Sequence, residues 1–114
     1  MEVLLMVMEN WKQEYESRIM TVENAIKLIH SGDRVVLGHS TAIPITITDA
    51  MVEHYEDYHD VELIQMSPFG NANFCDPKCE GHFRLNSIFT GALTREAIAD
   101  GRADFTPVYF HDLP

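Results

Sequence analysis

The hydrophobic positions of this chain fall into short runs that predict strands, separated by segments with helical spacing. Apolar and β-branched residues bounded by turn residues predict strands at 34–38, 61–66 and 85–90. A fourth run at 104–110 contains Pro107, which is typical of a bulge or an edge strand. The first run is apolar almost throughout, and this pattern favours a strand that is covered on both faces.

The segments between those runs have helical spacing. Thr21 is a candidate N-cap for a helix whose apolar face includes Ile26 and Ile29, and Gly32 is expected to end that helix as a left-handed C-terminal cap. Residues 45–59 also have helical period, and residues 94–100 predict a short helix closed by Gly101. The alternation predicts an α/β fold, an open, mostly parallel sheet of about four strands with right-handed crossovers and flanking helices on both faces.

The amino-terminal residues form a separate segment in this interpretation. Met8 is a second start-like methionine, so residues 1–10 are either a disordered segment or an extension from an upstream start, while residues 3–7 also have the composition of a short strand. Trp11 and Tyr15, at positions i and i+4, predict a short helix over 9–18 that these aromatic rings anchor. We expect the domain itself to cover residues 11–114.

Composition and charge narrow the functional classes. A chain of 114 residues with 46% hydrophobic positions has the size and the core of one domain. A formal net charge of -10 opposes binding to phosphate backbones, so nucleic acids and anionic membranes are poor partners. No segment approaches the ~20 apolar residues of a spanning helix, and none resembles a signal peptide, so we expect a cytoplasmic protein with reduced thiols.

Candidate binding residues follow the predicted strands, because open α/β sheets bind ligands at the carboxyl ends of their strands. A glycine at a strand end more often marks only a tight turn, and the alternative is that it lets a backbone amide approach a carbonyl or carboxylate closely. The second strand end opens a long connection, 67–81, and connections of this length are usually functional. The candidates are Gly38, His39 and Ser40, then Met66, Ser67, Pro68, Phe69 and Gly70, and finally Phe110 and His111. Of the histidines, His39 and His111 are placed for acid–base chemistry.

Two cysteines lie in the long connection. Cys75 and Cys79, with Asp76 and His82 nearby, supply donors of the kind that zinc prefers. The spacing lacks the usual Cys-x-x-Cys pair, and structural zinc needs four ligands, so two free thiols are the better interpretation. We therefore expect no metal, and a metal-binding loop protein is kept as an alternative.

Three blocks of sequence follow one another with distinctive motifs. The first is TVENAIKLIHSGDRVVLGH at 21–39, and the second is DVELIQM at 60–66. The third is HFRLNSIFTG at 82–91, followed by TREAI at 94–98, GRADFTP at 101–107 and HDLP at 111–114. From about Trp11 to the last residue the chain resembles the amino-terminal part of the acetyl-CoA hydrolase/transferase family, particularly the 4-hydroxybutyrate, butyryl and acetate CoA-transferases.

The resemblance implies a much longer two-domain α/β enzyme that works as a dimer or higher oligomer. Such enzymes move CoA between an acyl-CoA and a small carboxylic acid, so CoA is a substrate and no cofactor is bound permanently. In the family a glutamate of the carboxyl-terminal domain, preceded by Ser or Thr, attacks the thioester and then holds CoA as a glutamyl thioester. None of the ten glutamates here follows Ser or Thr, so we expect no catalytic nucleophile in this chain.

The sequence therefore predicts the amino-terminal portion of a CoA-transferase that is inactive alone and contributes the acyl or carboxylate pocket. Its expected partner is a carboxyl-terminal CoA-transferase domain. Asp112 stands where the family more usually has Glu, and we assign it no role. The alternative is a non-catalytic binding module or a subunit of a split enzyme. Because the last strand has no helix after it, we also expect a homo-oligomer that associates through the 104–110 edge.

Overall fold

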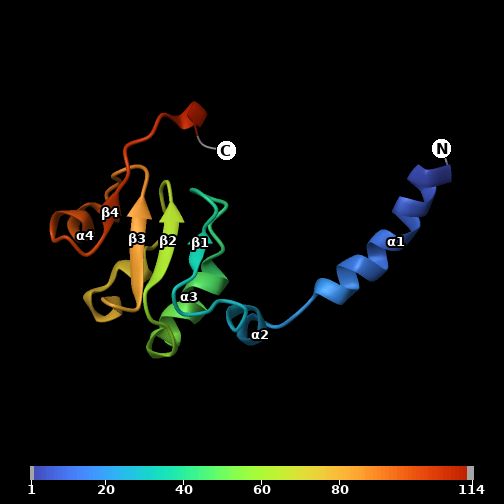
Figure 1. Ribbon diagram of the computed structural model, residues 1–114, viewed down its shortest axis with the longest axis horizontal. Helices are drawn as coiled ribbons and strands as arrows, with labels where there is room; N and C mark the ends of the chain where they lie inside the picture. The colour runs from blue at the N-terminus through green and yellow to red at the C-terminus, as the bar shows by residue number, and fades with distance from the viewer. Residues whose placement is uncertain (1, 113–114) are drawn as a thin grey trace.

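The computed structural model describes the backbone of residues 2–112 and the side chains of residues 10–112 (Figure 1). A small α/β body follows one long helix that stands away from it. The helices are α1 (Glu2–Arg18), α2 (Val22–Ile26), α3 (Ile45–Glu53) and α4 (Arg95–Ala99), and the strands are β1 (Arg34–Val36), β2 (Val61–Gln65), β3 (Phe83–Ser87) and β4 (Asp104–Phe105). Single 3-10 turns lie at Tyr55–Asp57, Asn73–Cys75, Pro77–Cys79 and Phe110–Asp112.

The four strands form one sheet in the order β1-β2-β3-β4, and every neighbouring pair is parallel. Val35 pairs with Leu63, and Leu63 pairs with Leu85, so the three inner side chains lie in one row. The predicted fold class, an open parallel sheet with flanking helices, is confirmed. Because crossovers between parallel strands are right-handed, strands that pair in chain order have their connections on the same face.

The two faces of the sheet differ in burial. On the covered face Leu63 and Leu85 are almost completely buried, together with the core residues Met51 and Phe74 from the connecting segments. On the opposite face Val36 is 73% exposed and Arg84 is exposed as well. The prediction of a first strand covered on both faces, with helices on both sides of the sheet, is therefore wrong. For a strand at the edge of its sheet, an apolar run in the sequence does not show whether one or both faces of the sheet are covered.

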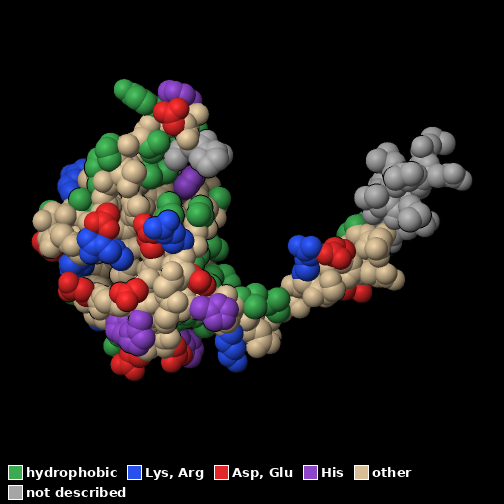
Figure 2. Space-filling model, in the orientation of Figure 1, with side chains coloured by type: hydrophobic (Ala, Val, Ile, Leu, Met, Phe, Trp, Pro, Cys, Tyr) green, Lys and Arg blue, Asp and Glu red, His purple; other side chains and the backbone are tan. Residues whose placement is uncertain are grey.

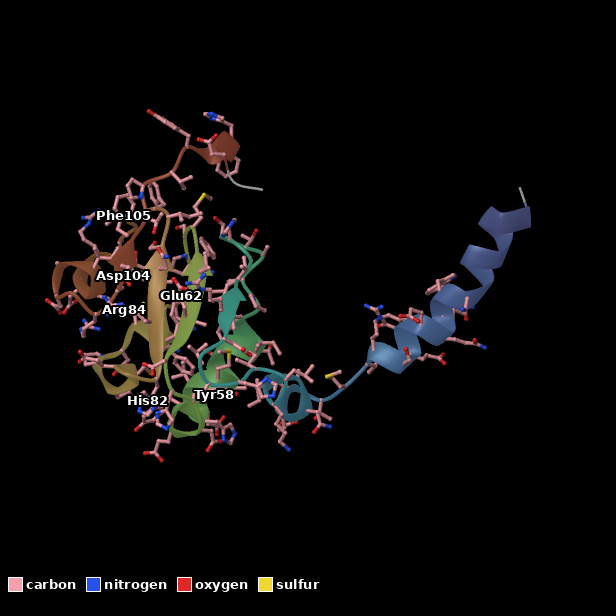
Figure 3. All side chains as sticks on the ribbon, viewed as in Figure 1. Tyr58, Glu62, His82, Arg84, Asp104 and Phe105 are labelled. Carbon is pink, nitrogen blue, oxygen red and sulfur yellow. The ribbon has the colours of Figure 1, made fainter. Side chains whose placement is uncertain are left out.

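The exposed face carries a hydrogen-bonded row of polar side chains that crosses the strands. Arg34 pairs with Glu62 at 2.7 Å, the amide of Asn86 donates to Glu62 at 3.0 Å, and the Thr106 hydroxyl donates to Asn86 at 2.7 Å. Figure 3 shows the neighbouring pair, in which Arg84 contacts Asp104 across β3 and β4. Hydrogen bonds from Arg84 lower the pKa of Asp104 below its ordinary value. These cross-strand contacts satisfy the polar groups of a face that the described chain leaves to solvent.

Helix α2 is shorter than expected. Thr21 is its N-cap as predicted, and its hydroxyl accepts a hydrogen bond from the Asn24 amide at 3.4 Å. The helix ends at Ile26, however, rather than at Gly32. The carboxylate of Asp33 accepts from the His30 amide at 2.8 Å, and this local bond replaces a helical one. Gly32, with φ +84°, forms the turn into β1 instead of a helix cap.

The expected 45–59 helix is also divided. Helix α3 ends at Glu53, and a 3-10 turn at Tyr55–Asp57 follows it. Met51, Val52 and Tyr58 of this segment are buried in the core.

The last two strands differ from their predicted ranges. Strand β3 begins at Phe83 rather than at residue 85, because Val61 of β2 pairs with Phe83. Strand β4 ends at Phe105, not at residue 110. The Thr106 amide still donates to the Ser87 carbonyl at 2.9 Å, but Pro107 has no amide hydrogen with which to continue the ladder. Association through this edge remains a prediction.

Helix α1 includes amino-terminal residues for which the sequence analysis considered disorder or a short strand as alternatives. Its backbone is helical from Glu2 to Arg18, so the strand alternative for residues 3–7 is wrong. Trp11 is 55% exposed and Tyr15 is 63% exposed, so these rings do not anchor the helix to the body as predicted. An upstream start remains a prediction.

The hydrogen bond between the Tyr58 hydroxyl and the Ile26 carbonyl, 2.9 Å long and buried, joins α2 to the core. We predict that Tyr58→Phe lowers the free energy of unfolding by about 0.5–1.5 kcal/mol, because a buried hydrogen bond is lost while the Ile26 carbonyl keeps the Ile29 amide, at 3.2 Å, as its other donor. Tyr55→Phe is the matched control, since its hydroxyl contacts only Glu56 at the surface. Urea denaturation measures both variants, and equal stability of the two would contradict the prediction.

Candidate substrate-binding edge

The turns that follow β1 and β2 lie side by side at the carboxyl end of the sheet. The Ser40 amide donates to the Ser67 carbonyl at 2.8 Å, and Ser40 pairs with Pro68 as an isolated parallel bridge. The backbone pairing of the two strands thus continues into the turns. Two groups of candidate residues far apart in sequence are therefore held against each other.

The first turn is tight enough to require glycine at its start. A Cβ atom on Gly38 would lie 2.2 Å from the backbone oxygen of Ala42. Ser40 has φ 50°, in the left-handed region, and the Ala42 amide donates to the His39 carbonyl at 2.9 Å. Gly38 is thus required for the close approach of two backbone segments.

His39 has a defined hydrogen-bond partner on the neighbouring strand end. Its Nδ1 atom accepts from the Met66 amide at 3.1 Å, and the ring is half-buried. Since a neutral imidazole carries one proton, acceptance at Nδ1 assigns that proton to Nε2. The Nε2–H group is then a donor that suits a carbonyl or carboxylate oxygen.

Two buried polar residues that the sequence analysis did not identify stabilise this edge from the covered face of the sheet. Gln65 is completely buried, and its side-chain amide donates to the Gly38 carbonyl at 2.7 Å. Ser87, paired with Gln65 across β2 and β3, is also buried and donates to the Phe89 carbonyl at 2.7 Å. Both positions face the covered side of the sheet, where the alternation of each strand calls for an apolar residue. A polar residue at an expected apolar position was the sequence feature that could have identified these two residues.

The remaining candidate residues are more exposed. Phe69 is 61% exposed and lies, with Gly70, near the start of the long connection. The prediction that Phe110 and His111 directly follow the fourth strand is wrong, because β4 ends five residues before Phe110. Both residues lie in the 3-10 turn Phe110–Asp112. Figure 1 shows that turn on the same end of the molecule as the strand tips. Phe110 is 71% exposed, and its role in a pocket remains a prediction.

The two cysteines are free thiols in the long connection. Burial raises the pKa of Cys75 to about 11, and burial also raises the pKa of Cys79. Arg102 donates a 2.5 Å hydrogen bond to the Cys75 carbonyl and so ties the connection to the segment after α4. Within the described residues, no group of three or more His, Cys, Asp or Glu side chains could hold a metal ion. The metal-binding alternative therefore finds no ligand set there.

These features define an open parallel α/β domain, and its candidate residues lie mainly at the carboxyl edge of the sheet, the edge at which ligands bind in open α/β sheets generally. Residues 5–114 match the family model for the acetyl-CoA hydrolase/transferase N-terminal domain. The chain belongs to this family, and the match covers nearly its whole length.

The chain is similar to curated enzymes that transfer CoA. It is 33% identical over 104 residues to the 4-hydroxybutyrate coenzyme A transferase of Clostridium kluyveri, a match that covers 91% of this chain and 24% of that enzyme. It is 26% identical over 108 residues to the butyryl-CoA:acetate CoA-transferase of Anaerostipes caccae, covering 92% of this chain and 24% of the relative. The chain thus spans about a quarter of the length of these relatives.

The fold is also found in a solved structure. RipA from Yersinia pestis superposes with a TM-score of 0.71 at 22% identity, over 88% of this chain and 26% of that one. This likeness supports the fold. Separately, none of the described helices has the length and apolar character needed to cross a membrane.

Gly38 offers a direct test of the tight turn. We predict that Gly38→Ala lowers the free energy of unfolding by about 1–3 kcal/mol, because the added methyl group meets backbone atoms that cannot move aside cheaply. Gly91→Ala is the matched control, since its Cβ would lie at an ordinary 3.6 Å from the Ser67 hydroxyl. Urea denaturation should separate the two variants, and an unaffected Gly38→Ala variant would refute the close approach.

The thiols offer a second test. We predict that Cys75 is alkylated at least about a hundredfold more slowly in the folded chain than in urea, because its raised pKa leaves little thiolate, whereas a free thiol has a pKa near 8.5. Peptide mapping after timed iodoacetamide treatment measures Cys75 and Cys79 separately. Equal rates in folded and unfolded chains would contradict the burial of Cys75.

Proposed function

We propose that this chain is the amino-terminal portion of a CoA-transferase that moves CoA between an acyl-CoA and a short carboxylic acid of the acetate, butyrate or 4-hydroxybutyrate class. Membership of the family supports the reaction type. The names of the two relatives described above support the substrate class. CoA is a substrate in this proposal, no permanently bound cofactor is needed, and the enzyme acts in the cytoplasm as a homo-oligomer.

The contribution of this chain is the pocket for the acyl group or the free carboxylate. The observation that carries this assignment is the hydrogen bond from the Met66 amide to His39 Nδ1, which leaves the Nε2–H group as a donor at the edge. A carboxylate or thioester oxygen bound there accepts that hydrogen bond. Ser40 and Ser67, adjacent on the paired turns, add hydroxyl groups to the same edge.

The catalytic carboxylate comes from outside this chain in the proposed mechanism. A glutamate of the carboxyl-terminal domain attacks the thioester carbonyl and expels the CoA thiolate, giving an acyl-glutamyl anhydride. The thiolate then attacks the glutamyl carbonyl and releases the carboxylic acid, so CoA is held as a glutamyl thioester until the second acid collects it. The candidate edge residues of this chain include no carboxylate, in keeping with a binding role.

A second candidate is a non-catalytic binding module or a subunit of a split enzyme. Two observations favour it over a complete enzyme: the candidate edge residues include no carboxylate, and the net charge of -10 is unfavourable for the phosphates of CoA. The two candidates differ in whether a carboxyl-terminal domain restores activity.

We predict that the isolated chain shows no CoA transfer above background. Addition of the separately produced remainder of the Clostridium kluyveri 4-hydroxybutyrate enzyme should restore transfer, measured as formation of the new acyl-CoA. His39→Ala should lower the restored rate at least about tenfold, by loss of a hydrogen bond to a charged or developing oxygen. The matched control is His30→Ala, an exposed histidine in the turn after α2.

The outcomes separate the candidates. Turnover by the pure chain would contradict the assignment of the nucleophile to another domain. Failure of the remainder to restore transfer, with both pieces folded and associated, would favour the binding module. Equal effects of the two histidine variants would remove His39 from the pocket while leaving the family assignment intact.

A further inference from the structure

Gln65 is a polar residue in the core under the covered face of the sheet. Figure 2 shows charged side chains gathered over the strands on the exposed face, where water can reach them. Gln65 lies on the opposite face, in the same alternation as the buried Val61 and Leu63, and it is completely buried. Such positions are usually apolar, because a buried amide needs partners for both its donor and its acceptor.

The orientation of the Gln65 amide is fixed by the Gly38 carbonyl, to which Nε2 donates at 2.7 Å. A carbonyl oxygen can only accept, so the nitrogen of the amide points toward Gly38 and the oxygen Oε1 points away from it. Among residues 10–112 no group donates a hydrogen bond to Oε1, although this atom is buried. A buried carbonyl without a donor is unfavourable to the folded state. Gln65 thus holds Gly38 while its own acceptor stays unsatisfied within the described chain.

The hydrogen bond to Gly38 acts on His39, because the Gly38 carbonyl and the His39 nitrogen belong to one planar peptide unit. A bond that fixes the oxygen of this unit restricts the direction in which the His39 side chain leaves the backbone. Met66, the residue after Gln65, donates its amide hydrogen to His39 Nδ1 at 3.1 Å. Two consecutive residues at the end of β2 therefore hold His39, one through its peptide and one through its ring.

The turn that carries His39 needs such contacts in order to keep its shape. Ser40, the next residue, has φ 50°, a left-handed conformation that is unfavourable for a residue with a side chain. A backbone of this kind persists only where the surrounding structure holds it. The bond from the Ser40 amide to the Ser67 carbonyl, at 2.8 Å, holds the turn against the neighbouring strand end. Gln65 holds it from the covered face.

We propose that Gln65 is a positioning residue for His39. Its amide fixes the Gly38–His39 peptide, so that the ring keeps its hydrogen bond with the Met66 amide and presents Nε2–H at the edge. The expected effect on CoA transfer rests on the proposed function, in which His39 binds a substrate oxygen, whereas the expected effect on the ring does not. An apolar residue of the same size would suit the core, but it would leave the peptide free to turn.

The variant Gln65→Met tests the effect on the ring, because methionine has a similar length and no amide. At about pH 8, where free imidazoles are neutral, long-range nitrogen–proton NMR of the full chain should show His39 as one Nε2–H tautomer. The variant should show a mixture of tautomers. The Met66 amide should exchange its hydrogen at least about tenfold faster in the variant, measured relative to the Val61 amide at the other end of β2.

Tyr58→Phe is the matched control for stability. It removes a buried hydrogen bond from the other end of the sheet, so it should change neither the His39 tautomer nor the relative exchange of Met66. Urea denaturation should show that Gln65→Met is no less stable than Tyr58→Phe. The reason is that the methionine variant loses a buried acceptor without a donor together with the hydrogen bond.

The restored rate of CoA transfer tests whether Gln65 acts through His39. With the remainder of the Clostridium kluyveri enzyme added, Gln65→Met should lower the rate at least about threefold, and it should have no further effect in the His39→Ala background. A residue with a merely structural role would lower the rate by the same factor in both backgrounds. Tyr58→Phe should leave the restored rate unchanged.

The wild-type chain supplies a measurement that applies even if Gln65→Met does not fold. Gln13 is exposed on α1 and serves as an internal reference for the buried Gln65. The side-chain amide protons of Gln65 should exchange at least about a hundredfold more slowly than those of Gln13, because one of them is hydrogen-bonded and both are buried.

Three results would overturn the proposal. The first is a wild-type chain in which His39 carries its proton on Nδ1, or in which the amide protons of Gln65 exchange as fast as those of Gln13. The second is a folded Gln65→Met variant with an unchanged His39 tautomer and unchanged exchange of Met66. The third is an equal loss of rate in both backgrounds. If His39→Ala leaves transfer unchanged, the proposed function of His39 fails, and the NMR and exchange results decide whether Gln65 positions the ring.

Discussion

The parallel pairing of β1 with β2 is the interaction on which the candidate site depends. β1 has only three residues, but its pairing continues past the strand end through the Ser40–Pro68 bridge. That continuation holds the turn of Gly38 against the turn of Met66 and orients the His39 ring. The buried Gln65 amide adds a second tie to the Gly38 carbonyl. The positions of the Gly38 turn and of the His39 ring thus follow from one short ladder of backbone hydrogen bonds.

The order of the strands has a second consequence for the molecule. Strands that pair in chain order with right-handed crossovers bury one face of the sheet and leave the other open. The open face is made compatible with water by charged and amide side chains that satisfy one another across the strands. A small domain built on one covered face has limited apolar burial, which agrees with the exposed apolar residues elsewhere on its surface.

The role that we propose for the chain is recognition of the acid rather than covalent catalysis. The candidate edge combines a histidine donor, two serines and close backbone segments, all suited to the oxygen atoms of a carboxylate or thioester. The acidic surface is unsuited to a phosphate-rich cofactor tail. Residues 5–114 match the acetyl-CoA hydrolase/transferase N-terminal domain. In the function proposed here, the edge residues bind the acid and another domain supplies the nucleophile.

The sequence by itself determined the fold class, the Thr21 cap, the identity of the family and the position of two of the three candidate groups at strand ends, whereas their binding role stays a prediction. These depend on local periodicity, turn chemistry and motif order, which are properties of neighbouring residues. Only the tertiary structure decided that the described residues leave one face of the sheet open, that β4 ends before Pro107, that Gln65 supports Gly38, and that Trp11 lies exposed on α1. Each of these depends on contacts, or on their absence within the described chain, between segments far apart in sequence. Local sequence patterns indicate which secondary structure a segment can form, whereas the assembled sheet determines which other segments it contacts.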